Sequence, residues 1–302
     1  MKRAIVTGAT GAVGTALVRE LIENNIETLV LCREGSSRIQ QIPKHPLVTL
    51  RYCSLDQLAF IENDTGKTFD VFYHLAWEGT TGVARNDMYL QHRNARYALD
   101  AVDAAHRFGC KKYIGAGSQA EYGRVDGVLR SDTPTFPETG YGIAKLCAGQ
   151  MSREQAHQLG MEHNWVRILS VYGPNDGEQS VVMYTINKLK NHEIPQFTKG
   201  EQIWDYLYSD DAGRAFRLIG EKGIDGKVYV LGSGKAKPLG KYLEDIRNIV
   251  NPTGEIALGA IPYGDKQIMF LQADITELVR DTEWQPSMDF KNGITNILRI
   301  NR

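Results

Sequence analysis

A tyrosine and a lysine stand four residues apart at the start of a long helical pattern. This spacing puts the phenol of Tyr141 and the ammonium of Lys145 on one face of the helix. A neighbouring cation stabilises a phenolate and lowers the pKa of a tyrosine toward neutrality. Such a phenol can exchange a proton with an alcohol or a ketone while a hydride moves at the carbon. Ser118 follows the strand pattern at 112–114 and can hydrogen-bond the same oxygen, so these three residues are the predicted catalytic set.

A glycine-rich loop near the N-terminus has the spacing of a dinucleotide-binding turn. Its glycines follow the apolar run 4–6 and precede an amphipathic helical pattern. This spacing allows a tight turn, a close approach of the backbone to a pyrophosphate and close packing of helix on strand. The free N–H groups at the start of the helix then hold the anion. We therefore expect a bound dinucleotide, with contacts from Gly8, Thr10, Gly11, Ala12, Val13 and Gly14.

The end of the second strand pattern, at 28–32, indicates which dinucleotide is bound. An NAD site places an acidic residue there to bind the 2′-hydroxyl of the ribose. This chain has Cys32 and Arg33 near that position, followed by Ser37 and Arg38. These side chains can hold a 2′-phosphate through charge-assisted hydrogen bonds. We expect NADP(H) as the cofactor, and the glutamate that follows Arg33 keeps NAD(H) open as the alternative.

Alternating strand and helix patterns in the first half must position these residues. Short apolar runs predict strands at 4–6, 28–32, 48–52, 71–75, 112–116 and 163–168. Helical patterns fill the intervals, and the two longest cover 87–108 and 141–159. Such an alternation pairs its strands in parallel through right-handed crossovers, with helices on both faces. We therefore expect an α/β fold with a Rossmann-type doubly wound parallel sheet.

The second half has shorter patterns that glycines and prolines interrupt. We expect residues 1–168 to form the dinucleotide-binding domain, with a return segment near 202–230. Residues 169–302 are expected to form mainly a smaller substrate-binding lobe packed on the first. A site in the crevice between the two parts is the default expectation for such a fold.

Composition excludes several classes of protein. The 302 residues carry 35 basic and 36 acidic side chains, so nothing attracts nucleic acid in bulk. The four cysteines have no zinc-site spacing, and we expect no metal. No apolar stretch approaches the length of a membrane helix, and the run after Met1 is too short for a signal peptide. We expect a cytoplasmic protein without nucleic-acid or membrane partners.

The chain resembles the extended short-chain dehydrogenase/reductases, in the group of nucleotide-sugar epimerases and dehydratases. The resemblance covers nearly the whole length, through seven motifs in the family's order. They are the glycine loop at 8–14, Asp70-x-x-x-His74-Leu75-Ala76, Asn94, the set Ser118, Tyr141 and Lys145, Tyr172-Gly173-Pro174, residues 204–212, and residues 273–286. The resemblance implies an NAD(P)-dependent oxidoreductase and a nucleoside-diphosphate sugar bound in the C-terminal lobe. It also implies a homodimer packed through the helices at 87–108 and 141–159.

The expected contacts follow from these motifs and from the glycine-rich loop 77–85, which lies at the rim of the site. Further cofactor contacts are expected from Leu75, Ala76, Trp77, Tyr141 and Lys145. Substrate contacts are expected from Gly79, Thr80, Ser118, Gln119, Glu121, Tyr141 and Trp204. Trp204 replaces an arginine that in the family commonly helps to bind the diphosphate, and it can stack on a base or sugar or pack in the core. Arg167, Lys188 and Lys190 are the alternative clamps.

Departures from the family pattern narrow the reaction. Relatives that perform 4,6-dehydration have an Asp and a Glu where this chain has Gln119 and Ala120, and neither of these transfers a proton. Relatives that epimerise beside the ketone place a Cys next to the serine. Here that position is also Gln119, and Cys147 faces away from the phenol.

Two redox reactions remain. One is the reduction of a C4 ketone with exchangeable NADP(H), and the other is a 4-epimerisation with captive NAD(H). The run 115–123 together with 204–208 resembles reductases that act on 4-keto-6-deoxy nucleotide sugars, which favours reduction. A non-catalytic NADP-binding regulator is a second alternative, although such relatives usually lose the tyrosine or the lysine that this chain keeps. The sequence leaves the nucleotide base, the sugar and the product stereochemistry open.

Overall fold

Seven parallel strands form the central sheet of the protein. The structure, a computed structural model, describes residues 1–300, and the last two residues of the predicted second lobe lie outside this range. The strand order is β11-β6-β5-β4-β1-β2-β3, and every neighbouring pair is parallel. The strands are β1 (Arg3–Thr7), β2 (Glu27–Cys32), β3 (Val48–Tyr52), β4 (Val71–His74), β5 (Lys112–Ser118), β6 (Glu162–Ile168) and β11 (Val228–Leu231). The predicted doubly wound sheet is confirmed.

The order of the strands reverses beside β1. The chain runs from β1 outward to β2 and β3, and then returns to β4 on the other side of β1. Thr7, the last residue of β1, pairs with Leu31 in β2 and with His74 in β4. Crossovers therefore leave this point in opposite directions, and ligands of open α/β sheets bind at the carboxyl ends of the strands there. The glycine loop begins at the next residue, Gly8.

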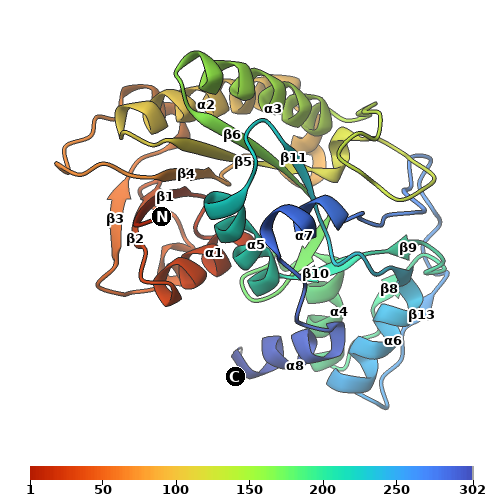
Figure 1. The fold of residues 1–302 in the computed structure, drawn as a ribbon. Helices are drawn as coiled ribbons and strands as arrows, with labels where there is room; N and C mark the ends of the chain where they lie inside the picture. The colour runs from red at the N-terminus through yellow and green to blue at the C-terminus, as the bar shows by residue number, and fades with distance from the viewer. Residues whose placement is uncertain (301–302) are drawn as a thin grey trace.

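Helices cover both faces of the sheet (Figure 1). On one face, α1 (Ala12–Glu23) packs against α5 (Ser209–Lys222). On the other face, α2 (Met88–Arg107) packs against α3 (Gly140–Gln158). The predicted boundaries of the two long helices, 87–108 and 141–159, differ from these by one residue at each end. Each helix pair buries an apolar stripe against the strands, which holds the sheet between two dry layers.

Short 3₁₀ turns complete the cofactor-domain connections. They are η1 (Ile39–Gln41), η2 (Leu55–Phe60), η3 (Gly82–Asn86) and η4 (Gln119–Glu121). Two of them, η3 and η4, follow strands β4 and β5 at the carboxyl edge of the sheet, next to the start of α3.

The remaining elements form a smaller lobe below the sheet (Figure 1). Its helices are α4 (Val181–Lys190), α6 (Leu239–Val250) and α8 (Phe290–Ile300), while α7 (Thr276–Thr282) packs against α5 and β11. Its strands pair in twos: β7 (Ser170–Tyr172) with β10 (Tyr206–Tyr208), β9 (Ile203–Trp204) with β12 (Lys237–Pro238), and β8 (Gln196–Phe197) with β13 (Ala257–Leu258). After β10 the chain returns to the first domain through α5 and β11.

Buried carboxylates tie the late segments to the rest of the chain. Asp205, with no exposed surface, accepts hydrogen bonds from the backbone N–H groups of Ser233, Gly234 and Ala273. Each bond joins this residue, which lies between β9 and β10, to a segment distant in sequence. A buried charge is stable only when its oxygens are hydrogen-bonded in this way, so Asp205 fixes how the smaller lobe closes on the sheet.

Candidate active site

The predicted catalytic residues meet where β5 ends and α3 begins. Ser118 is the last residue of β5, and Tyr141 and Lys145 lie one turn apart in the first turns of α3. Thr139 caps that helix, because its hydroxyl accepts a hydrogen bond from the N–H of Gly142 at 3.1 Å. The three residues of the predicted catalytic set are buried, with 9%, 9% and 3% of their surface exposed. The cap and the strand end thus bring a hydroxyl, a phenol and an ammonium together away from bulk water.

The ammonium of Lys145 is held between backbone and aromatic surfaces. It donates a hydrogen bond to the carbonyl of Ala116 in β5 at 2.6 Å. It also lies 3.7 Å from the centre of the Trp77 ring, a close cation–π contact. Burial lowers the pKa of Lys145 to about 7, and the charge of Glu121 acts in the opposite direction. The position of the amine is fixed, while its charge depends on pH near neutrality.

The Tyr141 phenol is surrounded by groups with opposing effects. Burial raises the pKa of Tyr141, hydrogen bonding with Ser118 and the charge of Arg85 lower it, and the charge of Glu121 raises it. The guanidinium of Arg85 lies 4.4 Å from the centre of the Tyr141 ring. Trp77 meets the same ring edge-on, with the ring centres 6.1 Å apart. Charged groups on more than one element therefore act on the pKa of the Tyr141 phenol.

The carboxylate of Glu121 lies behind Ser118 and is 1% exposed. One oxygen accepts hydrogen bonds from the N–H of Ser118 at 2.7 Å and from the indole of Trp165 at 2.9 Å. The other accepts from the Nε of Arg167 at 2.8 Å. Glu121 was expected among the substrate contacts, and the structure instead directs both of its oxygens to protein donors. Arg167 is buried in this ion pair, which takes it away from a role as the phosphate clamp.

A cavity of about 650 Å³ opens at the switch point of the sheet. It brings together most of the predicted cofactor residues: Gly8, Thr10, Gly11, Arg33, Ser37, Arg38, Leu75, Ala76 and Trp77. Gly79 and Thr80, expected to contact the substrate, line the same cavity. Ala12, Val13 and Gly14 form the first turn of α1, just behind the loop. Tyr141 and Lys145 reach the cavity wall through their contacts with Trp77.

Two positions of the loop require glycine. Gly8 has a φ of 75°, and a Cβ there would lie 2.6 Å from the backbone nitrogen of Ala76. At Gly14 a Cβ would lie 2.1 Å from the carbonyl oxygen of Gly8. The N-cap of α1 is Gly11, which has no side chain to occupy the first N–H groups of the helix. These groups are left for an anionic ligand such as a pyrophosphate.

The loop between β4 and α2 is clamped by two buried amides of α2. The side chain of Asn94 bonds both the N–H and the carbonyl of Glu78, at 3.0 and 2.9 Å. The amide of Gln91 donates to the carbonyls of Gly79 and Ala84, at 2.9 and 2.8 Å. Because the loop backbone is held at both ends, its side chains are fixed relative to the cavity and to α3.

Several site residues were missed by the sequence reasoning. Cys53, Ser54, Leu55 and Leu58 also line the cavity. The signal that could have found them is their place after β3, since the carboxyl ends of parallel strands share one edge. Arg38 makes a further contact, because its guanidinium donates to the carbonyl of Asn175 in the segment that follows β7.

The two remaining predicted substrate contacts, Gln119 and Trp204, have different surroundings. Gln119 is half-buried, and its carbonyl oxygen is buried without a hydrogen-bond partner among residues 1–300. Trp204 is half-buried against the apolar cluster of Tyr122, Leu129 and Leu271, and its indole donates to Ser170 at 2.8 Å. This packing favours the core interpretation of Trp204 over stacking on a ligand.

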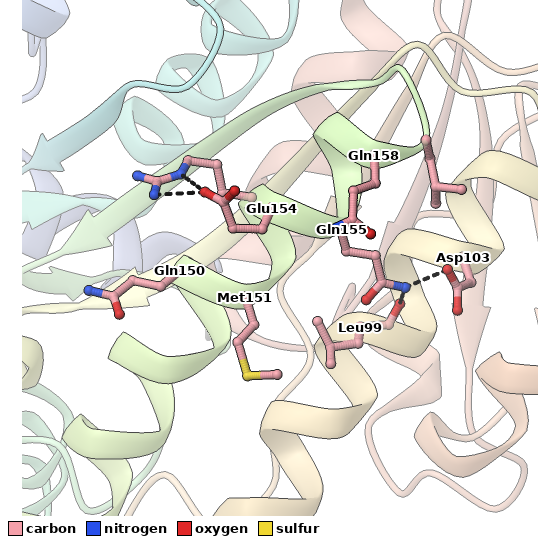
Figure 2. A pocket seen from close by; sticks show the side chains of 9 residues that line it. Leu99, Asp103, Gln150, Met151, Glu154, Gln155 and Gln158 are labelled. Carbon is pink, nitrogen blue, oxygen red and sulfur yellow. Dashed lines mark hydrogen bonds and ion pairs between the residues drawn. The ribbon is translucent and has the colours of Figure 1, made fainter.

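A second hollow, of about 830 Å³, lies on the outer side of α2 and α3 (Figure 2). Gln155 on α3 donates a hydrogen bond to Asp103 on α2, and Met151 on α3 also lines the hollow. Its lining comes from the second half of α3 and from α2, and it shares no residue with the cavity at the switch point of the sheet. In the part of the chain that the structure describes, no helix has the length and apolar character needed to cross a membrane.

The fold and this site define an α/β enzyme built around a dinucleotide. Residues 4–232 match the model of the NAD-dependent epimerase/dehydratase family, and the chain belongs to that family. A nicotinamide dinucleotide is therefore its cofactor class, and the cradle of Gly8, Gly11 and the first turn of α1 fits such a group.

Similar proteins cover the whole chain. A CDP-abequose synthase of Salmonella typhimurium is 26% identical over 98% of this chain and 97% of its own length. A dTDP-4-dehydro-6-deoxyglucose reductase of Escherichia coli is 23% identical over 98% and 96%. Among solved structures, a UDP-N-acetylglucosamine 4-epimerase from Methanobrevibacter ruminantium M1 superposes with a TM-score of 0.88 over 99% of both chains, at 21% identity. The solved epimerase shares the fold of this chain, and the reactions named for the three proteins differ.

The substitution Glu121→Gln tests the buried carboxylate. It leaves Arg167 as an unpaired buried cation, so the free energy of unfolding should fall by about 3 kcal/mol, as measured by urea denaturation. The matched control is Glu138→Gln, which breaks an exposed pair with Arg124 of 2.7 Å and should change stability little. Equal losses in the two variants would contradict the role of burial.

Proposed function

We propose that the protein reduces the C4 ketone of a nucleoside-diphosphate 4-keto-6-deoxy sugar with NADP(H). The observation that carries the proposal is the buried set of Ser118, Tyr141 and Lys145 beside the dinucleotide cavity. The printed functions of the Salmonella and Escherichia coli relatives support a nucleotide sugar as the substrate class.

In this proposal Tyr141 is the general acid. Its phenol gives a proton to the carbonyl oxygen while a hydride adds to the carbonyl carbon, which leaves an alcohol and a phenolate. The hydride is what a bound reduced nicotinamide supplies, and solvent later returns the proton to the phenolate. Ser118 orients the carbonyl by hydrogen bonding. Lys145 stabilises the phenolate by its charge and holds the ribose of the cofactor.

The neighbouring positions argue against dehydration. Elimination of water across a sugar needs an acid and a base beside the serine. Gln119 and Ala120 carry no titratable group. The carboxylate of Glu121, which follows them, is bound by three protein donors and closed off from the cavity. A direct reduction needs none of these groups.

The proposed reaction is tested with NADPH and a panel of 4-keto-6-deoxy sugars carried on dTDP, CDP, GDP and UDP. Stoichiometric loss of NADPH absorbance with one member is the expected result, and it also identifies the base. The variant Tyr141→Phe should lose most of kcat and still bind NADPH, because only the acid is removed. Normal turnover by that variant would contradict the assignment.

Other outcomes of the same assay separate the alternatives. Purified protein that retains NAD(H) and interconverts UDP-hexoses without consuming NADPH would support the 4-epimerase instead. An intact catalytic set that turns over no sugar nucleotide would support the non-catalytic regulator. Both results would overturn the ketoreductase proposal.

The charge of the cavity supports NADP(H) over NAD(H). Arg33, Ser36, Ser37 and Arg38 line one end, and Glu78 lies on a different loop. Glu34 is exposed and stands outside the lining. A 2′-phosphate at this end would therefore meet two guanidinium groups and two hydroxyls.

The double variant Arg33→Ala/Arg38→Ala tests this cofactor preference. Its affinity for NADPH should fall about 10- to 100-fold, while its affinity for NADH should change little, because NADH lacks the 2′-phosphate that the two guanidinium groups would bind. Fluorescence titration of both cofactors measures the ratio. The control Glu34→Gln should leave the ratio near that of the parent, and equal losses for NADPH and NADH would contradict the preference.

We propose further that two chains associate through α2 and α3. These helices expose large apolar side chains, among them Tyr89 at 82%, Ile143 at 52% and Met151 at 49%. They also flank the outer hollow of Figure 2. Exposed apolar side chains gathered on one surface are typical of an interface between chains.

Light scattering during gel filtration tests this association. The parent should have the mass of two chains, and Ile143→Asp/Met151→Lys should have the mass of one, because charges would be buried in the interface. The control Ile224→Asp changes a residue that is 48% exposed beyond the end of α5 and should leave the dimer intact. A parent that is already monomeric would refute the dimer.

A further inference from the structure

The catalytic phenol has two cations beside its ring. Lys145 is the expected one, and its nitrogen lies 5.8 Å from the ring centre of Tyr141. Arg85, which belongs to η3, lies closer, with its guanidinium carbon 4.4 Å from the same centre. Arg85 is the last residue of the glycine-rich loop 77–85, and it was not among the residues expected to contact cofactor or substrate. The two cations reach the phenol from different elements, one from α3 and one from the loop after β4.

The position of Arg85 is set by hydrogen bonds on both sides of it in the chain. The carbonyl of Ala84 accepts from the buried side chain of Gln91 at 2.8 Å. The side-chain oxygen of Asn86 accepts from the N–H of Gly140, the residue before Tyr141, at 3.0 Å. The guanidinium itself donates to the carbonyl of Thr80 at 2.9 Å. The loop thus fixes the cation against the start of α3.

The charged groups around Tyr141 differ in how their charge depends on pH. Arg85 faces the ring from η3, Lys145 from α3, and Glu121 lies behind Ser118 on η4 with its charge opposed by Arg167. Burial lowers the pKa of Lys145 to about 7, so its charge varies around neutral pH. A guanidinium stays protonated throughout. Arg85 is therefore the constant positive charge next to the phenol.

We propose that Arg85 acts with Lys145 to stabilise the Tyr141 phenolate, with its guanidinium stacked on the phenol ring. The inference rests on the proposed function only in that Tyr141 gives up its proton to the substrate. Arg85 transfers no proton. The proton moves from the phenol to the carbonyl oxygen, the negative charge remains on the ring oxygen, and the guanidinium lowers the energy of that charge.

The test measures the ionisation of residue 141 without any turnover. Tyr141→difluorotyrosine, made in the full-length protein, gives a phenol that ionises in a range where the protein stays folded, and fluorine NMR reports its pKa. In the same background, Arg85→Gln should raise that pKa by about one pH unit, because an adjacent cation is lost. Arg85→Lys keeps the charge and should give a smaller rise. Arg247→Gln, in the last turn of α6 in the smaller lobe, should give none.

The variants distinguish an effect of the positive charge of Arg85 from an effect of its hydrogen bond to the loop. An unchanged pKa in Arg85→Gln overturns the proposal. A rise of the same size in Arg85→Lys and Arg85→Gln also overturns it, because the bond to Thr80 and not the charge would then matter. A rise in KM for the sugar nucleotide without a change in pKa would make Arg85 a substrate-binding residue instead.

The same variants distinguish failure of this inference from failure of the proposed function. The pKa of residue 141 can respond to Arg85 even if no ketone is reduced, which would refute the proposed function alone. If ketone reduction is found, the tyrosine must be protonated to act, so activity falls as pH rises through its pKa. Arg85→Gln should move that alkaline limb to higher pH by the same amount as the fluorine titration. An unmoved limb would refute the role of Arg85 alone.

Discussion

The hydrogen bonds to the carboxylate of Glu121 hold together the ends of the strands beside the candidate active site. A carboxylate removed from water is stable only if donors replace the lost solvent. Here the donors come from the end of β5, through the N–H of Ser118, and from β6, through Trp165 and Arg167. The need to satisfy one buried charge therefore joins two strands and fixes the backbone of Ser118 at the end of β5. The free-energy cost of burying the carboxylate is offset by its ion pair with Arg167, so loss of either charge would leave the other buried and unpaired.

The hydrogen bond from Trp165 to Glu121 depends on glycines that leave room for the indole. The Trp165 indole lies flat between β5 and α3, where a Cβ at Gly115, Gly117 or Gly149 would come within 2.2, 2.3 and 2.7 Å of its atoms. Close approach of the helix to the sheet is possible only with these glycines, and it allows Lys145 to reach a β5 carbonyl. The glycines on β5 and α3 thus set how closely Lys145 approaches Ser118. If larger residues replaced them, no change at Ser118 or Lys145 could compensate for the greater separation of helix and sheet.

Sequence patterns predicted the sheet, the glycine loop and the Tyr141 helix because each depends on residues close together in the chain. Period and spacing express such local constraints directly. The role of Arg85 and the inward direction of Glu121 were out of reach, since each depends on how distant segments meet: η3 against α3, and β5 against β6. Trp204 illustrates the same limit. The tryptophan in place of the family's arginine indicates from sequence alone that residue 204 has a different role. Only its packing against Leu129 and Leu271 shows that this role is structural.

The contact between Arg38 and the carbonyl of Asn175 has a thermodynamic consequence. Arg38 lines the cavity at the switch point of the sheet, and Asn175 belongs to the segment leading from β7 into α4 of the smaller lobe. An anion that attracts this guanidinium alters its bond to the lobe on the other side of the crevice. The occupancies of the two parts of the molecule are then linked, and linkage is reciprocal. A ligand bound against one part would change the affinity of the other part for its own ligand, and the size of the change would be the same in either order of binding.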